Sequence, residues 1–145
     1  MANSQALIDP SSLLDPWCSA LLSETLAAHG IDRMALHDPA RLSHALGAPE
    51  SKRRLIEALV ALLQAPLQGN APALRAHALD RAPALRSHIE LAEHCIQALP
   101  KVLSGQISAT DVLFPGGTSS WVESIYKNNP WADYFNRLTA KAARQ

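Results

Sequence analysis

The stretch LLDPWCSALLSETLAAHG, residues 13–30, decides the fold class of this chain. Its apolar residues recur at three- and four-residue spacing, which lines one face of an α-helix. Gly30 follows the last apolar turn, where a helix commonly ends in a left-handed glycine. The segment therefore predicts one helix with an apolar face. That face consists of Leu14, Trp17, Cys18, Leu21, Leu22, Thr25 and Leu26.

A short helix is predicted next, at HDPARLSHALG, residues 37–47. Asp38 can cap this helix, Pro39 fits its first turn and Gly47 stops it. Another helix is expected to open after Pro49, because helical spacing resumes there. Its predicted apolar face consists of Leu55, Ile56, Leu59, Val60, Leu62 and Leu63.

A longer helix is predicted to begin at Ser87, which stands at capping-box spacing from Glu90. Pro100 is expected to bend or end this helix. No alternating run of β-branched and aromatic residues reaches four positions, so strand signals are nearly absent. The sequence therefore predicts an all-α fold, an irregular multi-helix domain with short helices. The residues predicted to face inward from the longer helix are Ile89, Ala92, Ile96 and Leu99.

One helical domain is expected over residues 1–145, because this length suits a single core. N-terminal helices should occupy residues 1–65, and residues 87–145 should form the C-terminal part. Residues 66–86 are predicted to be an irregular connection containing short helical turns. That prediction depends on the three prolines of the connection, Pro66, Pro72 and Pro83.

Composition and charge narrow the function classes. The chain is 48% hydrophobic and carries 13 basic and 13 acidic residues, as ordinary soluble domains do. This balance offers no electrostatic footprint for nucleic acid or an anionic membrane. No apolar run is long enough to span a bilayer, and the first residues do not resemble a signal peptide. Cys18 and Cys95 are predicted to be buried thiols in a reducing compartment, so a cytoplasmic location is expected.

Aromatic residues gather in the stretch DVLFPGGTSSWVESIYKNNPWADYFNRL, which we call the aromatic segment (residues 111–138). It holds both Phe, both Tyr and two of the three Trp of the chain. Ser120 and Glu123 form a second capping-box spacing, so a helix should start near Trp121. A last helix is expected to follow, with Asn129 as its cap and Pro130 in its first turn. Its aromatic face would present Trp131, Tyr134, Phe135 and Leu138.

The sequence predicts no catalytic residue and no metal site. The glycine-rich stretch 116–120 resembles an anion-binding turn, but no Walker lysine follows it and no strand precedes it. His88 and His94 are six residues apart, so they point in different directions from a helix and cannot form a metal pair. Glu123 and Asp133 lie near the aromatic residues without a recognisable catalytic partner.

From about Glu90 onward, the chain resembles a known family. ATDVLFP (109–115), Gly117, VESIY (122–126) and ADYFN (132–136) follow one another at characteristic spacing. This order is similar to the helical lid that leads into the C-methyltransferase domains of modular polyketide synthases. The sequence departs from the family at Thr118, where Ser is common, and at Trp121, where Leu or a similar residue is usual.

The resemblance implies a function without a complete active site. In the family, a Rossmann-like core follows the lid and holds S-adenosylmethionine on a glycine-rich motif, E-x-G-x-G-x-G. That motif is absent from these 145 residues, so this chain alone is expected to bind no cofactor. S-adenosylmethionine would serve the complete methyltransferase. The implied partners are the methyltransferase core, neighbouring polyketide synthase domains and an acyl carrier protein.

The aromatic segment is the candidate site. As a lid surface it would close the cofactor and acyl-chain cavity of the core, which large apolar groups line well. The same aromatics could instead pack the core of this domain. A helical docking or interaction module of the same assembly line is the alternative function. The residues expected to face substrate or core are Phe114, Trp121, Tyr126, Trp131 and Tyr134.

Overall fold

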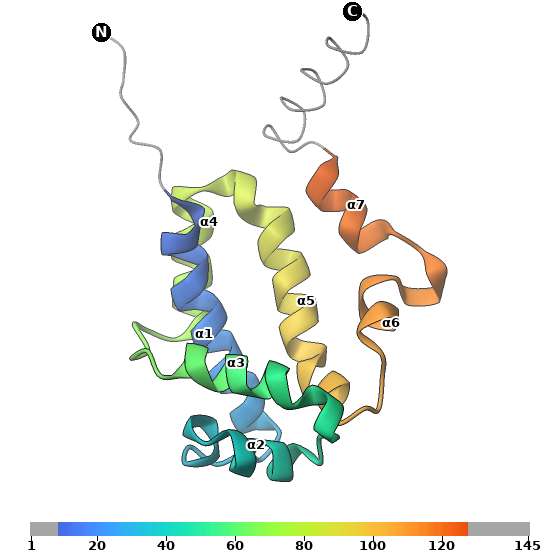
Figure 1. The fold of residues 1–145 in the computed structure, drawn as a ribbon. Helices are drawn as coiled ribbons and strands as arrows, with labels where there is room; N and C mark the ends of the chain where they lie inside the picture. The colour runs from blue at the N-terminus through green and yellow to red at the C-terminus, as the bar shows by residue number, and fades with distance from the viewer. Residues whose placement is uncertain (1–8, 128–145) are drawn as a thin grey trace, which may run out of the picture.

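The computed structural model describes residues 9–127, which form helices and no strand (Figure 1). The predicted all-α fold is confirmed. Short 3-10 turns lie at Ala35–His37, Glu50–Lys52, Pro83–Leu85 and Pro115–Gly117. The α-helices are α1 (Pro10–Ala28), α2 (Pro39–Leu46), α3 (Arg53–Leu63), α4 (Ala71–Arg81), α5 (Arg86–Leu103), α6 (Ala109–Leu113) and α7 (Ser120–Tyr126).

The helices are arranged around α1. Helices α4 and α5 both pack against α1, and α3 crosses the lower part of this group with α2 beneath it (Figure 1). After α5 the chain turns back, so that α6 and α7 lie along the outer side of α5. No helix of the described residues is both long and apolar enough to cross a membrane.

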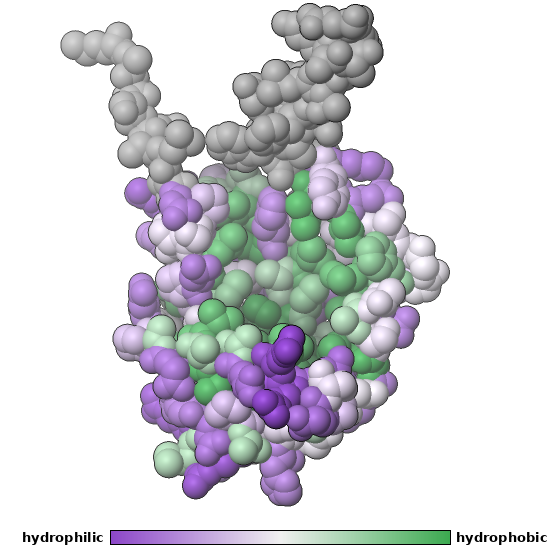
Figure 2. Space-filling view, in the orientation of Figure 1, coloured by the Kyte–Doolittle hydropathy of each residue, from purple (hydrophilic) through white to green (hydrophobic). Residues whose placement is uncertain are grey.

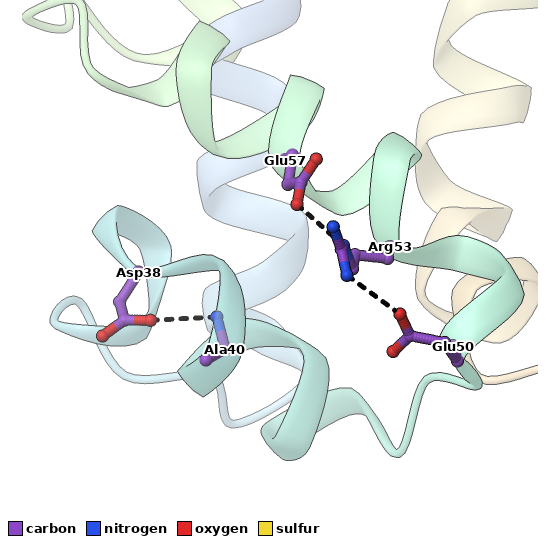
Figure 3. Close-up of polar contacts among 5 residues, drawn as sticks. All are labelled: Asp38, Ala40, Glu50, Arg53 and Glu57. Carbon is purple, nitrogen blue, oxygen red and sulfur yellow. Dashed lines mark hydrogen bonds and ion pairs between the residues drawn. The ribbon is translucent and has the colours of Figure 1, made fainter.

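The ends of α2 follow from its sequence. The Asp38 carboxylate accepts a hydrogen bond from the backbone N–H group of Ala40 at 2.9 Å (Figure 3). It also accepts one from the N–H group of Arg41 at 3.1 Å. These bonds satisfy donors that have no partner inside the helix. At the other end Gly47 has a φ of 62°, a left-handed conformation that disfavours residues with a Cβ. The predicted cap, first turn and stop of this helix are confirmed.

The basic run near residue 53 lies on the surface. The exposed Arg53 guanidinium is 3.3 Å from the Glu50 carboxylate and 3.1 Å from that of Glu57 (Figure 3). Such exposed ion pairs contribute little to stability, because water screens them. Since both acidic partners neutralise Arg53, the run Lys52-Arg53-Arg54 behaves as a solvated helix start.

The larger of two core clusters joins α1, α2, α3 and the end of α5. Leu26, Leu42 and Leu103 are completely buried in it, and Ile56 is nearly so. Leu55 and Leu62 are exposed, so the apolar face of α3 is narrower than predicted. A face made of Ile56, Leu59, Val60 and Leu63 suffices, because α3 packs on one side only.

The second cluster lies between the first half of α1, α4 and the start of α5. Trp17, Ala20, Ala78 and Ile89 are fully buried there, together with the nearly buried Ala71. Small residues on α4 leave room for the indole ring of Trp17, since a close-packed interior pairs large side chains with small ones. Trp17 is the largest fully buried side chain of this cluster.

Helix α4 corrects the prediction of an irregular connection at residues 66–86. Asn70 caps this 11-residue helix by accepting a hydrogen bond from the Ala73 N–H at 2.9 Å, and Pro72 occupies its first turn. Proline is well tolerated there, so it marks the start of the helix. A carboxylate oxygen of Glu24 on α1 accepts a hydrogen bond from the Ala71 N–H at 2.8 Å, which ties the two helices together.

One prediction about α5 is also wrong, and one of the two outcomes predicted at Pro100 does not occur. The helix begins at Arg86, directly after the 3-10 turn, and Leu85 has no capping side chain. Ser87 therefore lies inside the helix and caps nothing. Pro100 does not end the helix, which continues to Leu103 because Val102 and Leu103 are buried in the core. The four residues predicted to face inward do pack against the two clusters.

Candidate functional site

The described part of the aromatic segment consists of α6, a tight turn and α7. Gly116 and Gly117 have φ values of 62° and 78°, which let the chain reverse between the two helices. The Thr118 hydroxyl donates a hydrogen bond to the Pro115 carbonyl at 2.9 Å and closes this turn. The glycines thus serve the backbone conformation of the turn.

His94 of α5 holds the segment against the rest of the domain. Its imidazole stacks on the indole of Trp121, with ring centroids 4.3 Å apart and planes inclined by 11°. Its Nε2 lies 2.9 Å from the Val112 carbonyl of α6. One side chain therefore contacts both α6 and α7. Sequence reasoning missed this contact, because residues 94 and 121 share no local pattern.

The candidate aromatics differ in exposure. Trp121 is half-buried against His94, whereas Phe114 is 38% exposed and Tyr126 is 64% exposed. Tyr126 follows Trp121 by five residues, about 140° around the helix, so it points away from α5. Trp131 and Tyr134, and the helix predicted after Asn129, lie outside the described residues. Apolar residues also gather on the surface near α5 and α7 (Figure 2).

The start of α7 is within one residue of its prediction, but its cap differs. Ser119 precedes the helix, and its hydroxyl donates to the Glu123 carboxylate. Glu123 also accepts a hydrogen bond from the Lys127 ammonium at 2.6 Å. The pKa of Glu123 is lowered by the bond from Lys127 first and the bond from Ser119 second. The capping box at Ser120 is therefore wrong, since Glu123 binds these two side chains.

Both cysteines are free and half-buried, whereas the sequence predicted full burial. Burial raises the pKa of the Cys18 thiol, with a smaller effect from the nearby charge of Asp15. Burial likewise raises the pKa of the Cys95 thiol. A thiol with a raised pKa is a weak nucleophile at neutral pH. Within residues 9–127, no group of three or more His, Cys, Asp or Glu side chains is placed to hold a metal ion.

Comparisons with known proteins show that this chain is similar to parts of polyketide synthases. No family model matches the sequence. The chain is 47% identical over 55 residues to polyketide synthase PksM of Bacillus subtilis (38% of this chain, 1% of PksM). It is 30% identical over 143 residues to polyketide synthase ThaG of Burkholderia thailandensis (88% of this chain, 2% of ThaG). The crystal structure of DszA carbon methyltransferase superposes with a TM-score of 0.71 and 26% identity.

The predicted resemblance to the carbon-methyltransferase region of polyketide synthases is confirmed. The match to DszA covers 92% of this chain and 39% of the DszA chain. This carbon-methyltransferase relationship therefore extends over nearly all of the chain, including the N-terminal helices in which the sequence showed only helical character. The chain spans 2% or less of the length of PksM and ThaG.

Replacing His94 by alanine should detach α7 from α5. Loss of the stacked ring and of the contact with the Val112 carbonyl should lower the free energy of unfolding by about 1–2 kcal/mol. Urea denaturation measures this loss, and proton NMR should show the Trp121 indole signals moving as the ring current disappears. His94→Phe is the matched control, because it keeps a ring for stacking. An indole spectrum unchanged in His94→Ala would contradict the positioning role of His94.

Proposed function

We propose that this chain is a non-catalytic helical lid of a polyketide synthase C-methyltransferase. The observation that carries the proposal is the structural match, in which 92% of this chain aligns with only 39% of a carbon methyltransferase. Most of that enzyme lies outside the matched part, and catalysis would belong there. The lid would position an acyl thioester that an acyl carrier protein presents to the complete enzyme.

The aromatic segment supports this role. Phe114, directly before the turn, and Tyr126, at the end of α7, both expose apolar ring surface. A contiguous apolar patch that includes these rings would mark a contact surface. The complete enzyme would use S-adenosylmethionine to methylate the carbon between the two carbonyl groups of a β-ketoacyl thioester. Closing such a site with aromatic groups would exclude water from the reacting atoms.

The isolated chain should not bind S-adenosylmethionine. A cofactor that binds only the folded state raises the melting temperature by mass action, by an amount that grows with concentration. We expect no shift at millimolar cofactor, because the glycine-rich motif of the core is absent from this sequence. A saturable shift at micromolar cofactor would contradict the lid assignment and reveal a cofactor site in this chain.

A reconstitution experiment tests the lid role. The part of DszA outside the match is purified, its folding is checked by its own melting transition, and this chain is added in trans. We expect the two proteins to associate and the mixture to methylate a carrier-bound β-ketoacyl thioester faster than the core alone. If the chain binds the acyl carrier protein and not the core, the alternative of a docking module is supported instead.

A further inference from the structure

A cavity of about 420 Å³ opens between α1, α3, α5 and the loop that follows α3. Its walls are mainly aliphatic. Leu62 and Leu67 line it while remaining 60% and 46% exposed, so the cavity meets solvent beside these two residues. Apolar surface occupies the middle of the molecule between α1 and α5 (Figure 2). The other aliphatic lining residues include Leu22, Leu59, Ile96 and Leu99.

This cavity is separate from the aromatic segment. Both features use α5, but from different sides. Ile96 and Leu99, which line the cavity, lie about 200° and 140° around the helix axis from His94, which stacks on Trp121. A molecule in the cavity therefore contacts the face of α5 opposite the one that holds α7.

The charge of the lining residues limits which head groups a ligand of this cavity can carry. Asp15 is the only charged side chain among the described residues that line the cavity, and no basic residue lies there. Ser19 and Gln68 add neutral hydrogen-bonding groups, and Ser19 follows Asp15 by one helical turn. A carboxylate or phosphate would meet the like charge of Asp15 without a cation to balance it. An ammonium or hydroxyl group meets no such repulsion.

We propose that the cavity binds an aliphatic chain whose head group is uncharged or positively charged. The volume lies within the range of about 300–1,000 Å³ in which proteins hold small ligands. The leucine and isoleucine walls cover the aliphatic chain, and the head group lies near Asp15, Ser19 and Gln68. The Cys18 thiol, which also lines the cavity, is covered when the ligand is bound.

Cys18 supplies the readout. In Cys95→Ala it is the only thiol of the chain. Because its pKa is raised, the rate of its modification by maleimide is followed at mildly alkaline pH, where more of the thiol is ionised. The probes are 1-octanol, octylamine and octanoate. A bound ligand slows modification by the factor one plus its concentration over Kd, about tenfold at ten times Kd. We expect octanol and octylamine to protect Cys18 and raise the melting temperature. Asp15 is exposed and water screens its charge, so octanoate should bind roughly fivefold more weakly than octylamine.

Three variants locate the ligand. Leu62→Asp replaces an aliphatic residue of the exposed mouth by a carboxylate and should abolish protection by octanol. Octylamine is not used with this variant, because the new carboxylate attracts its ammonium group. Leu55→Asp alters an exposed leucine of the same helix that does not line the cavity, and should leave protection unchanged. Asp15→Asn should bring octanoate to within about threefold of octylamine while octanol stays the same. Asp15→Asn retains nearly the same shape, so it tests the site even if Leu62→Asp fails to fold.

The proposal is overturned if none of the three probes protects Cys18 or raises the melting temperature. It is also overturned if Leu62→Asp folds and octanol still protects it, since the ligand then lies elsewhere. Octanoate that protects as well as octylamine in the parent would contradict the charge preference. Protection lost equally in Leu55→Asp and Leu62→Asp would contradict this location, because Leu55 is outside the cavity.

Discussion

Replacing Trp17 by alanine should lower the free energy of unfolding by about 3–5 kcal/mol, the range for removing a fully buried large aromatic side chain. Trp17 has no exposed surface, and three of the other four buried residues of the second cluster are alanines, which cannot fill the space. Domains of this size are stabilised by about 5–15 kcal/mol in total. We therefore expect Trp17→Ala to remove between about a fifth and all of that stability and to lower the melting temperature by many degrees.

Urea denaturation monitored by circular dichroism measures this loss of stability. Trp17→Phe, which keeps most of the ring volume and removes the indole N–H group, shows how much of the loss is due to volume. Within the described residues the indole N–H of Trp17 has no hydrogen-bond partner, so phenylalanine gives up no such bond. Trp17→Phe should lose only about 1–2 kcal/mol, because most of the ring volume remains. Tyr126→Ala, which removes a 64% exposed side chain, should change stability by less than about 0.5 kcal/mol. A loss below about 1 kcal/mol in Trp17→Ala would mean that α4 does not depend on this ring.

Trp17 and the aromatic residues of the aromatic segment differ in burial, and this difference helps to explain why most aromatic residues lie near the C-terminal end of the sequence. Trp17 fills a core cluster, whereas Phe114 and Tyr126 remain exposed and Trp121 is only half-buried. The described aromatics of the segment therefore contribute less to the core than their number suggests. That distribution supports a contact surface for part of the segment, with Trp121 anchoring it to α5.

Residue patterns within a few positions are sufficient to predict the ends of a helix that contains its own capping residue and its own terminating glycine. Helix α2 was predicted at both ends, because Asp38, Pro39 and Gly47 act through bonds and dihedral angles within the same few residues. Helix α4 was missed because its buried residues are alanines, which give little apolar contrast between its faces. Its prolines then suggested an irregular connection, although Asn70 and Pro72 form a good helix start.

Contacts between distant residues were beyond the reach of sequence patterns. Ser87 has the right spacing to Glu90, but the preceding 3-10 turn already places it inside α5. The stack of His94 on Trp121 and the cavity beside Leu62 depend on how α5 meets α7, α1 and α3. Such geometry follows from tertiary packing, and the residues involved show no common spacing in the chain.

Replacing Phe114 and Tyr126 together by alanine should weaken association with the methyltransferase core about 30–150-fold. The exposed parts of the two rings amount to roughly 200 Å², whose burial at about 25 cal/mol per Å² contributes about 5 kcal/mol before the losses of ordering. About 2–3 kcal/mol should remain as net binding energy, typical of an interface hot spot. Isothermal titration of the parent and the double variant against the core measures the difference.

Met34→Ala is the matched control for this experiment. Met34 is 67% exposed, a fraction close to the 64% of Tyr126, but it lies next to the 3-10 turn at Ala35–His37, outside the aromatic segment. We expect the control to bind the core with unchanged affinity, and both proteins to melt within a few degrees of the parent. Equal weakening in the control and the double variant would mean that the core recognises apolar exposure in general. Unchanged binding in the double variant would remove Phe114 and Tyr126 from the interface and leave Trp121, held by His94, as the described aromatic to test next.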